Sequence, residues 1–254
     1  MLKALLFDIN GTLTNIWTQE ESDDVYRVVS HFLIYQGVDV VPEELKHLYF
    51  EINRRMRETS RENDPEFDVV ALFKEIIETH QTAFYRALPK EKRKLLPELT
   101  AQVYRGASLQ RLQLYDDVRA TLDTLKERYA MAAVSDGQSV WGRAELNAVG
   151  LSSYFNPVLI SGDFGYRKPD RRFFQKALDA LNLQPQEAIY VGNDMYRDVY
   201  GAQKAGMKTV FFLSNQGEHH FPHTKPDYVI YKFSQLINAV AHFERKEVEK
   251  TAKK

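Results

Sequence analysis

From residue 116 onward the chain alternates between short apolar segments and longer segments with apolar residues three and four positions apart. The short segments have the length of buried strands, and the longer ones have the spacing of amphipathic helices. Strands that alternate with helices build a parallel sheet that helices cover on both faces. We therefore expect an α/β fold with a Rossmann-like, doubly wound parallel sheet. The expected strands are residues 130–134, 156–160, 188–191, 208–213 and 228–230, and the expected helices are residues 117–129, 139–149, 170–181, 197–205 and 233–242.

The alternation starts at the N-terminus and is then interrupted by a helical insertion. Residues 2–7 form an apolar run that predicts the first strand, whereas residues 18–107 have helical spacing almost throughout. We expect four helices in this segment and no strand between them. The predicted division is a core of residues 1–15 and 110–245, an inserted helical bundle of residues 16–109 and a charged tail of residues 246–254 that frays.

The composition excludes several classes of protein. The net charge of −1 gives no basic field for a nucleic-acid partner. No apolar stretch is long enough to span a membrane, and the N-terminus has no secretory signal pattern. Without cysteine there is no disulfide framework and no thiolate nucleophile. We expect a cytoplasmic protein with no nucleic-acid or membrane partner, and the sequence leaves its oligomeric state open.

Polar clusters follow four of the expected strands, each at the point where the strand ends. The carboxyl ends of parallel strands meet at one edge of the sheet, where doubly wound folds bind their ligands. Any one cluster is compatible with ordinary loop chemistry, but four at equivalent positions predict a common site. They are Asp8-Ile9-Asn10, Ser135-Asp136, Lys168-Pro169 and Gly192-Asn193-Asp194.

The residue types at these positions predict phosphoryl transfer. The carboxylates of Asp8 and Asp194 offer the oxygen ligands that Mg²⁺ prefers. The Ser135 hydroxyl and the Lys168 ammonium group can hold an anion by hydrogen bonds and charge. A carboxylate nucleophile beside a cation and an anion pocket is what transfer of a phosphoryl group to Asp8 requires.

With these motifs in their order, the chain resembles the haloacid dehalogenase-like (HAD) hydrolase superfamily, in the branch with a helical cap inserted after the first motif. The resemblance covers essentially the whole chain and implies that residues 16–109 are the cap. The four motifs that carry it are Asp8-Ile9-Asn10-Gly11-Thr12-Leu13, Ser135-Asp136-Gly137, Lys168 within Gly165-Tyr166-Arg167-Lys168-Pro169-Asp170, and Gly192-Asn193-Asp194-Met195-Tyr196-Arg197-Asp198.

The resemblance implies a role for each matching residue. Asp8 would be the nucleophile and a Mg²⁺ ligand, and Asn10 would give the metal its backbone carbonyl. Ser135 and Lys168 would hold the phosphoryl group. Asp194 would complete the metal site. Asp198 would support either the metal or Lys168. The implied activity is Mg²⁺-dependent hydrolysis of a small phosphorylated metabolite through an aspartyl-phosphate.

Asn10 departs from the family pattern, which carries Asp at this position to protonate the leaving group and later activate water. An amide cannot do this work, and general acid–base catalysis typically contributes roughly 10²–10⁴-fold. We therefore expect a phosphatase that is slow or selective for good leaving groups. Asn193 also departs from the commoner Gly-Asp opening of the fourth motif. Two alternatives stay open: a metal-independent dehalogenase of 2-haloacids, and a catalytically weak protein that binds a phosphorylated ligand or a partner.

Two further clusters have a simpler interpretation. His219, His220 and His223 predict an exposed loop more than a metal site. The basic run Arg54–Arg57 could meet an anionic substrate, although a solvated helix face explains it better.

Overall fold

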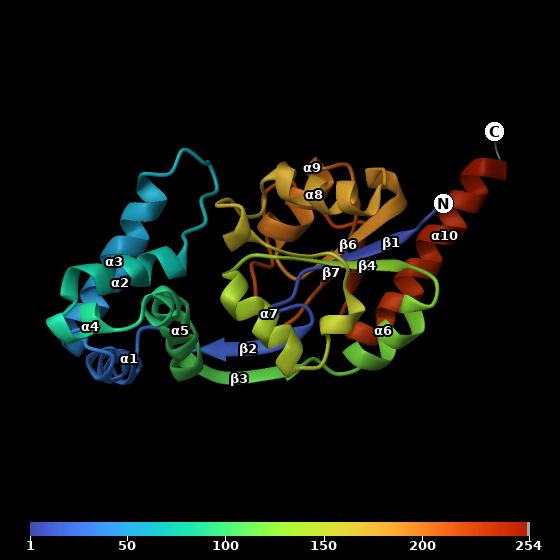
Figure 1. Cartoon of the computed structure of the whole chain (residues 1–254). Coiled ribbons are helices and arrows are strands. Elements are labelled where there is room, and N and C mark those ends of the chain that lie inside the picture. Colours follow the sequence, from blue (N-terminus) through green and yellow to red (C-terminus); the bar gives the residue numbers. More distant parts are fainter. Residues whose placement is uncertain (253–254) are drawn as a thin grey trace.

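The computed structural model of the chain describes residues 1–252, with side chains described up to residue 249. Its centre is a six-stranded parallel sheet in the order β5-β4-β1-β6-β7-β8 (Figure 1). This arrangement confirms the expected α/β fold. The strands are β1 (Ala4–Phe7), β4 (Ala130–Ser135), β5 (Val158–Ile160), β6 (Ala188–Gly192), β7 (Lys208–Phe212) and β8 (Tyr228–Ile230).

Helices cover both faces of the sheet, as a parallel sheet requires. Side chains alternate along β1, so that Leu5 and Phe7 pack on one face while Ala4 and Leu6 pack on the other. The first face is covered by α6 (Val118–Lys126), α7 (Ser139–Ala148) and α10 (Leu236–Ala252). The second face is covered by α8 (Arg171–Leu181) and α9 (Gly201–Lys204).

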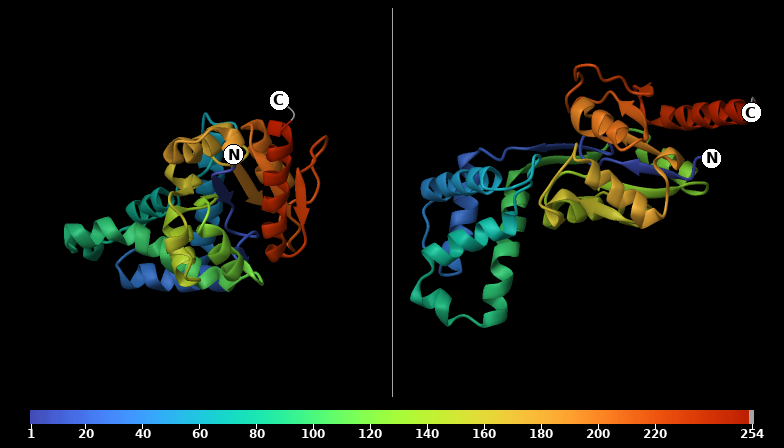
Figure 2. Two further views of the ribbon diagram at one scale, coloured as in Figure 1. Left: turned by 90° about the vertical axis from the view of Figure 1, so that its right-hand side faces the viewer. Right: turned by 90° about the horizontal axis from the view of Figure 1, so that it is seen from above.

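The inserted helices form a separate bundle at one end of the molecule (Figures 1 and 2). Its buried core is aromatic and includes Tyr26, Tyr49, Phe73 and Tyr104, with Trp141 of α7 packed among them. A helix of the sheet layer therefore anchors the bundle. The bundle contains α1 (Asp23–Tyr35), α2 (Pro42–Glu58), α3 (Val69–His80), α4 (Ala83–Ala87) and α5 (Lys90–Ser108).

An antiparallel ribbon connects the bundle to the sheet and was not predicted from the sequence. Strand β2 (Thr14–Thr18) pairs with β3 (Leu109–Leu114), so the chain enters and leaves the bundle along the same ribbon. Residues of both strands are half-buried, which hides the strict alternation that identifies a strand. Trp17 of β2 is about half exposed, at 51%. The predicted limits of core and bundle, at residues 15, 16, 109 and 110, stay a prediction.

Three local expectations differ from the structure. The bundle has a fifth, short helix, α4, whose first turn is capped by Thr82. The helix expected at residues 197–205 begins earlier, as a π-helical turn over Met195–Tyr200, before α9. The tail expected to fray is helical, because α10 continues to Ala252; residues 253–254 lie outside the described residues.

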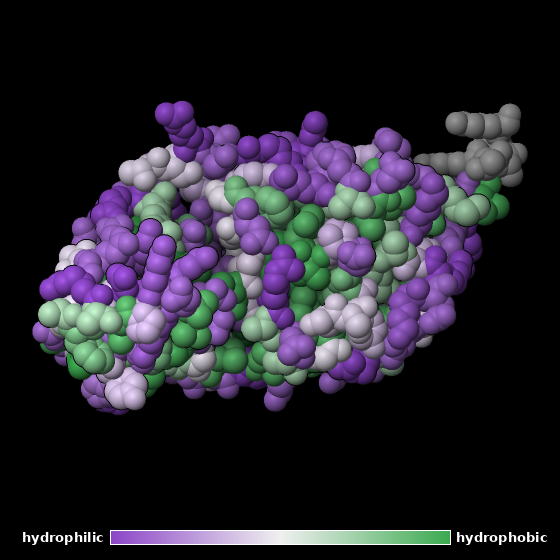
Figure 3. Space-filling view, in the orientation of Figure 1, coloured by the Kyte–Doolittle hydropathy of each residue, from purple (hydrophilic) through white to green (hydrophobic). Residues whose placement is uncertain are grey.

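One face of the molecule is mostly hydrophilic (Figure 3). Hydrophilic residues cover most of the face in Figure 3, with apolar patches toward its middle and lower part. Among residues 1–252, no helix is long and apolar enough to cross a membrane. His219, His220 and His223 are exposed in the loop between β7 and β8, as predicted.

Candidate active site

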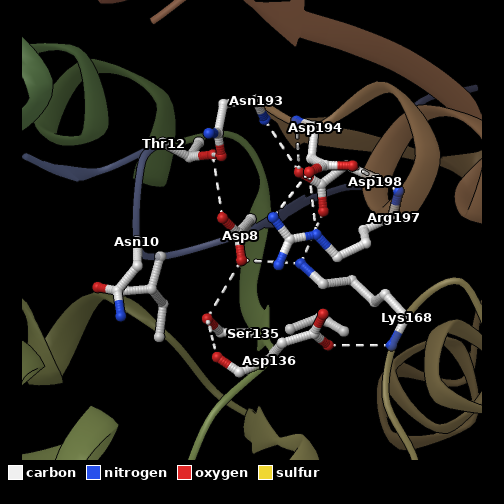
Figure 4. Close-up of polar contacts among 12 residues, drawn as sticks. Asp8, Asn10, Thr12, Ser135, Asp136, Lys168, Asn193, Asp194, Arg197 and Asp198 are labelled. Atoms are coloured by element: carbon white, nitrogen blue, oxygen red, sulfur yellow. Dashed lines mark hydrogen bonds and ion pairs between the residues drawn. The ribbon is translucent and has the colours of Figure 1, made fainter. Parts of the chain in front are cut away.

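The polar residues predicted to meet do lie together, at the carboxyl ends of the central strands (Figure 4). Strand β1 pairs with β4 on one side and β6 on the other, so the residues that follow these strands share one edge. Asp8 is buried there, and its Oδ1 accepts hydrogen bonds from Ser135 Oγ at 3.1 Å and Lys168 Nζ at 2.8 Å. Three of the four predicted clusters therefore meet at one carboxylate oxygen.

A tight turn after Asp8 fixes this carboxylate against the fourth cluster. Gly11 has φ +87°, and a Cβ atom at this position would lie 2.3 Å from Nδ2 of Asn193. Only glycine fits both the backbone conformation and the space. The hydroxyl of Thr12 lies 3.3 Å from Asp8 Oδ2 and 2.9 Å from Asn193 Oδ1. Thr12 thus connects the first motif to the fourth.

Lys168 is the buried cation at the centre of the site. Its Nζ donates to Asp8 Oδ1, to Asp198 Oδ1 at 2.6 Å and to the hydroxyl of Tyr190 at 3.0 Å. Burial lowers the pKa of the ammonium group, but the charges of Asp198 and Asp8 outweigh it and hold the pKa well above its usual value. Lys168 is therefore charged and fixed between two carboxylates.

Replacement of Lys168 by Met is expected to destabilise the fold strongly. The change leaves the Asp8 and Asp198 carboxylates buried without their shared counter-ion, and removal of one partner from a buried ion pair typically costs about 3–5 kcal/mol. The free energy of unfolding from urea titration measures this. Adding Asp198→Asn to the Met variant should restore part of the loss, whereas a loss below about 1 kcal/mol in Lys168→Met would show that the pair does not stabilise the fold.

Asp198 pairs with Lys168 and also binds the backbone of the loop that follows β6. Its Oδ2 accepts the backbone N–H groups of Asn193 and Asp194, both at 3.0 Å. This approach depends on Gly192, because a Cβ atom there would lie 2.4 Å from the Asp198 carboxyl group. Burial raises the pKa of Asp198 to about 6, although the charge of Lys168 acts in the opposite direction.

Asp194 is held by the helical turn that it caps. Its Oδ1 accepts the N–H groups of Tyr196 and Arg197 at 3.0 and 2.7 Å. Its Oδ2 accepts Nε and Nη2 of Arg197 at 2.9 and 2.7 Å, and the N–H of Glu218 at 3.2 Å. Burial alone would raise the pKa of this carboxyl, but the hydrogen bonds and charge of Arg197 lower it below its usual value. Asp194 is therefore an ionised cap with an arginine partner.

These contacts do not fit the Mg²⁺ ligand set predicted from the sequence. Both oxygens of Asp194 are committed to N–H donors, and both oxygens of Asp198 are committed to Lys168 and backbone N–H groups. Within the part of the chain that the structure describes, no three His, Cys, Asp or Glu side chains are grouped to hold a metal ion. Asp8 also accepts hydrogen bonds, from Ser135 and Lys168 at Oδ1 and from Thr12 at Oδ2.

The side chain of Asn10 points away from Asp8 (Figure 4). Its Nδ2 lies 3.4 Å from Oε2 of Glu145, a buried residue of α7. The other oxygen of Glu145 accepts Nε of Arg105 from α5 at 2.6 Å. The amide at position 10 therefore lies beside a carboxylate that an arginine of the bundle already pairs.

The loop between α2 and α3, residues 59–68, holds the bundle against the segment that precedes Lys168. Arg167 donates its backbone N–H to the carbonyl of Asp64, and Glu66 donates its own to the carbonyl of Gly165, both at 2.9 Å. Backbone pairing of this kind fixes the loop beside the candidate site.

Two cavities lie at this junction, and Lys168, Asp194 and Arg197 line both of them. Arg57 belongs to the basic run on α2 and lines the larger of the two, called the outer cavity. The other arginines of this run, Arg54 and Arg55, pair with Glu58 and Glu75 at the surface. The outer cavity, about 380 Å³, is lined by Arg57, Asn63, Asp64, Pro65, Arg167, Lys168, Asp194, Tyr196, Arg197 and Glu218. The inner cavity, about 70 Å³, is lined by Asp8, Asn10, Ser135, Asp136, Lys168, Asn193, Asp194, Arg197 and Asp198.

Sequence reasoning missed several residues of the site. Thr12 and Arg197 lie inside the quoted motifs, yet nothing in the sequence distinguishes their side chains from turn or helix-surface residues. Tyr190 occupies a strand position that reads as apolar, and its hydroxyl reaches Lys168. Glu145 lies on a helix far along the sequence, and only the fold brings it to Asn10.

Comparison with known proteins agrees with this arrangement. The family model for haloacid dehalogenase-like hydrolases matches residues 5–212. A glyceraldehyde 3-phosphate phosphatase of Methanopyrus kandleri is 27% identical over 244 residues, covering 94% of this chain and 97% of that protein. A phosphoserine phosphatase of Thermus thermophilus is 39% identical over 102 residues, covering 40% of this chain and 41% of that protein.

The fold is also similar to a solved structure. The crystal structure of a 2-haloacid dehalogenase from Pseudomonas syringae pv. Tomato DC3000 has a TM-score of 0.68 and 22% sequence identity, and the match covers 96% of this chain and all (100%) of that one. At this identity the similarity concerns the fold alone.

Proposed function

The chain belongs to the haloacid dehalogenase-like hydrolase family, and on this basis we propose that it is a phosphatase that hydrolyses a small phosphorylated metabolite through a covalent intermediate on Asp8. The observation that carries the proposal is the convergence of Ser135 and Lys168 on one oxygen of Asp8. The phosphatases of Methanopyrus kandleri and Thermus thermophilus support the reaction class. Their names give different substrates, so they do not select one for this chain.

The proposed reaction has two displacements at phosphorus. A carboxylate oxygen of Asp8 forms a bond to phosphorus while the bond from phosphorus to the leaving oxygen breaks. Water then attacks the aspartyl-phosphate, which releases inorganic phosphate and regenerates the carboxylate. Lys168 and Ser135 would hold the phosphoryl oxygens in both steps, because an ammonium group and a hydroxyl offset the charge that develops there.

Asn10 determines which substrates this site would turn over well. The amide cannot protonate a departing alkoxide, so an ester with a poor leaving group must take its proton from water. Acyl and aryl phosphates have leaving groups that need this proton least. We therefore expect a strong preference for such substrates over alkyl phosphates.

The helical bundle would act as a cap in this reaction. Its loop 59–68 pairs with the segment before Lys168, and Arg57 of α2 lines the outer cavity. A cap held in this way limits access of bulk water to the phosphoryl group. The Mg²⁺ expected from the family resemblance is assigned no step, because Asp194 and Asp198 are already bound to other groups.

A paired substrate assay tests the proposed function. Purified protein is offered an aryl phosphate, a set of phosphorylated metabolites and a 2-haloacid, each with Mg²⁺ and with a chelator. Release of phosphate that Asp8→Ala abolishes supports the phosphatase. Release of halide without metal would support a 2-haloacid dehalogenase, the second candidate, which the lack of a proton donor at Asn10 favours. Tight ligand binding without turnover would indicate a binding protein instead.

The phosphatase activity is expected to fall as the pH decreases through about 6. Below this value Asp198 binds a proton, and Lys168 loses one of its two anionic partners. The effect on stability has the opposite sign. The pKa of Asp198 in the folded protein lies above 3.8, its usual value in an unfolded chain, so protonation favours the native state. This contribution to stability is complete below pH 3.8 and is lost as the pH rises through about 6.

The dependence of kcat/KM on pH measures the effect. Asp198→Asn should remove the acid limb of the profile, even though its activity at neutral pH is lower. If the variant keeps an unchanged acid limb, another group controls that limb.

A further inference from the structure

Arg197 is one of the residues that line both the inner and the outer cavity. It follows Asp194 by three residues on the π-helical turn, so its side chain reaches back to the carboxylate that caps this turn. The guanidinium group donates Nε and Nη2 to Asp194 Oδ2. Among the described residues, its Nη1 has no hydrogen-bond acceptor. One edge of the guanidinium group is thus fixed, and the other edge is free to bind a ligand.

The charges around the inner cavity require a second cation for an anionic substrate. The cavity is lined by four carboxylates, which belong to Asp8, Asp136, Asp194 and Asp198. Lys168 and Arg197 are the two cationic side chains that line it. Lys168 already pairs with two of the carboxylates, so it offsets the charge of an incoming phosphoryl group only in part.

Arg197 has the chemical properties that this position needs. Burial lowers its pKa, but the hydrogen bonds and charge of Asp194 outweigh this and raise the pKa above its usual value, so the group stays charged. A guanidinium group binds phosphate oxygens through paired N–H donors. Its salt bridge to Asp194 fixes its direction before a ligand arrives, which reduces the entropy lost on binding.

We propose that Arg197 binds the phosphoryl group in the place that the family gives to a divalent cation, so that this site binds and turns over its substrate without Mg²⁺. The inference rests on the proposed phosphatase function. In this arrangement Asp194 is a positioning residue, since it fixes the guanidinium group and is not a metal ligand. The inference depends on one observation: Asp194 and Asp198, which the sequence predicts as metal ligands, bind Arg197 and Lys168 instead.

Anion and metal binding test the proposal without requiring turnover. Orthovanadate binding is measured by calorimetry in the presence of a chelator, and Mn²⁺ binding is measured by electron paramagnetic resonance. Wild-type protein should bind vanadate without metal and should bind Mn²⁺ weakly. Arg197→Gln should weaken vanadate binding by about 10- to 100-fold, the loss expected when charged hydrogen bonds are removed. Arg197→Lys should recover part of it.

The same variant should have the opposite effect on the metal. Arg197→Gln frees one oxygen of Asp194 from two N–H donors, so Mn²⁺ affinity should increase. The matched control is Arg128→Gln, which also removes an arginine from a pair with a carboxylate, that of Glu244 at 2.6 Å. Arg128 lies before β4, at the opposite edge of the sheet, so neither affinity should change. Circular dichroism confirms that each variant is folded.

Two results of the binding measurements would overturn the proposal. One is tight Mn²⁺ binding by the wild-type protein together with vanadate binding that needs a divalent ion; this needs no variant. The other is unchanged vanadate affinity in a folded Arg197→Gln protein. Phosphatase activity that appears only with Mg²⁺ would likewise reject the inference but keep the proposed function. Vanadate binding that depends on Arg197, with no hydrolysis of any phosphate ester, would reject the function but keep the anion site.

Discussion

Replacing Asp8 by Asn is expected to reduce turnover by about 10⁴-fold or more, the scale of loss when an enzyme loses its nucleophile. Asparagine has nearly the same shape, but its amide is a far weaker nucleophile than a carboxylate. The Ser135 and Lys168 groups stay in place, so binding of the substrate should be affected much less than kcat. Steady-state kinetics with an aryl phosphate separates the two effects.

A trapping experiment shows whether the loss comes from the covalent step. Protein quenched during turnover of a radiolabelled phosphate ester should carry label that hydroxylamine releases, as it does from acyl phosphates. Asp8→Asn should carry none. Label of equal amount in both proteins, or full activity of the variant, would place the nucleophile elsewhere.

Replacing Asn10 by Asp is expected to raise kcat for alkyl phosphates by roughly 10²–10⁴-fold, the usual contribution of a general acid or base. The gain should be smaller for aryl phosphates, whose leaving groups need no proton. If Asn10→Asp changes neither, position 10 does not limit the rate through proton transfer.

Glu145 should modify this gain in a measurable way. It lies 3.4 Å from Nδ2 of Asn10, so a new carboxylate at position 10 would face a like charge, which raises its pKa. A raised pKa keeps the new group protonated at higher pH. Because a proton donor must be protonated to act, the alkaline limb and optimum of Asn10→Asp should shift to lower pH when Glu145→Gln is added. An identical pH profile in the single and double variants would show that Glu145 does not affect position 10.

The sequence predicts the fold and the place of the site well, because both depend on where strands end. The residues at the carboxyl ends of β1, β4 and β5 meet at one edge whatever their side chains do, so Asp8, Ser135 and Lys168 could be grouped from the pattern alone. The inserted helices could be predicted for a different reason, because apolar periodicity distinguishes helices from strands over a segment of such length.

The roles of Asp194 and Asp198 could not be predicted in this way. A motif states that a carboxylate lies near the strand end, but not which donors its oxygens face. Arg197 lies three residues after Asp194, a spacing that is common on helices and gives no signal by itself. The β2–β3 ribbon was not predicted, because its half-buried strands lack the alternation of apolar and polar residues that identifies a strand.

Trp141 gives the molecule an optical reporter of its own. Its indole ring is buried in the aromatic core of the bundle and its Nε1 donates to the carbonyl of Ala101 at 2.8 Å, although the residue belongs to a helix of the sheet layer. Any separation of bundle from sheet must bring this ring into water and shift its emission to longer wavelength. The other tryptophan, Trp17, is already half exposed, so a protein with Phe at that position would report the separation through a single fluorophore.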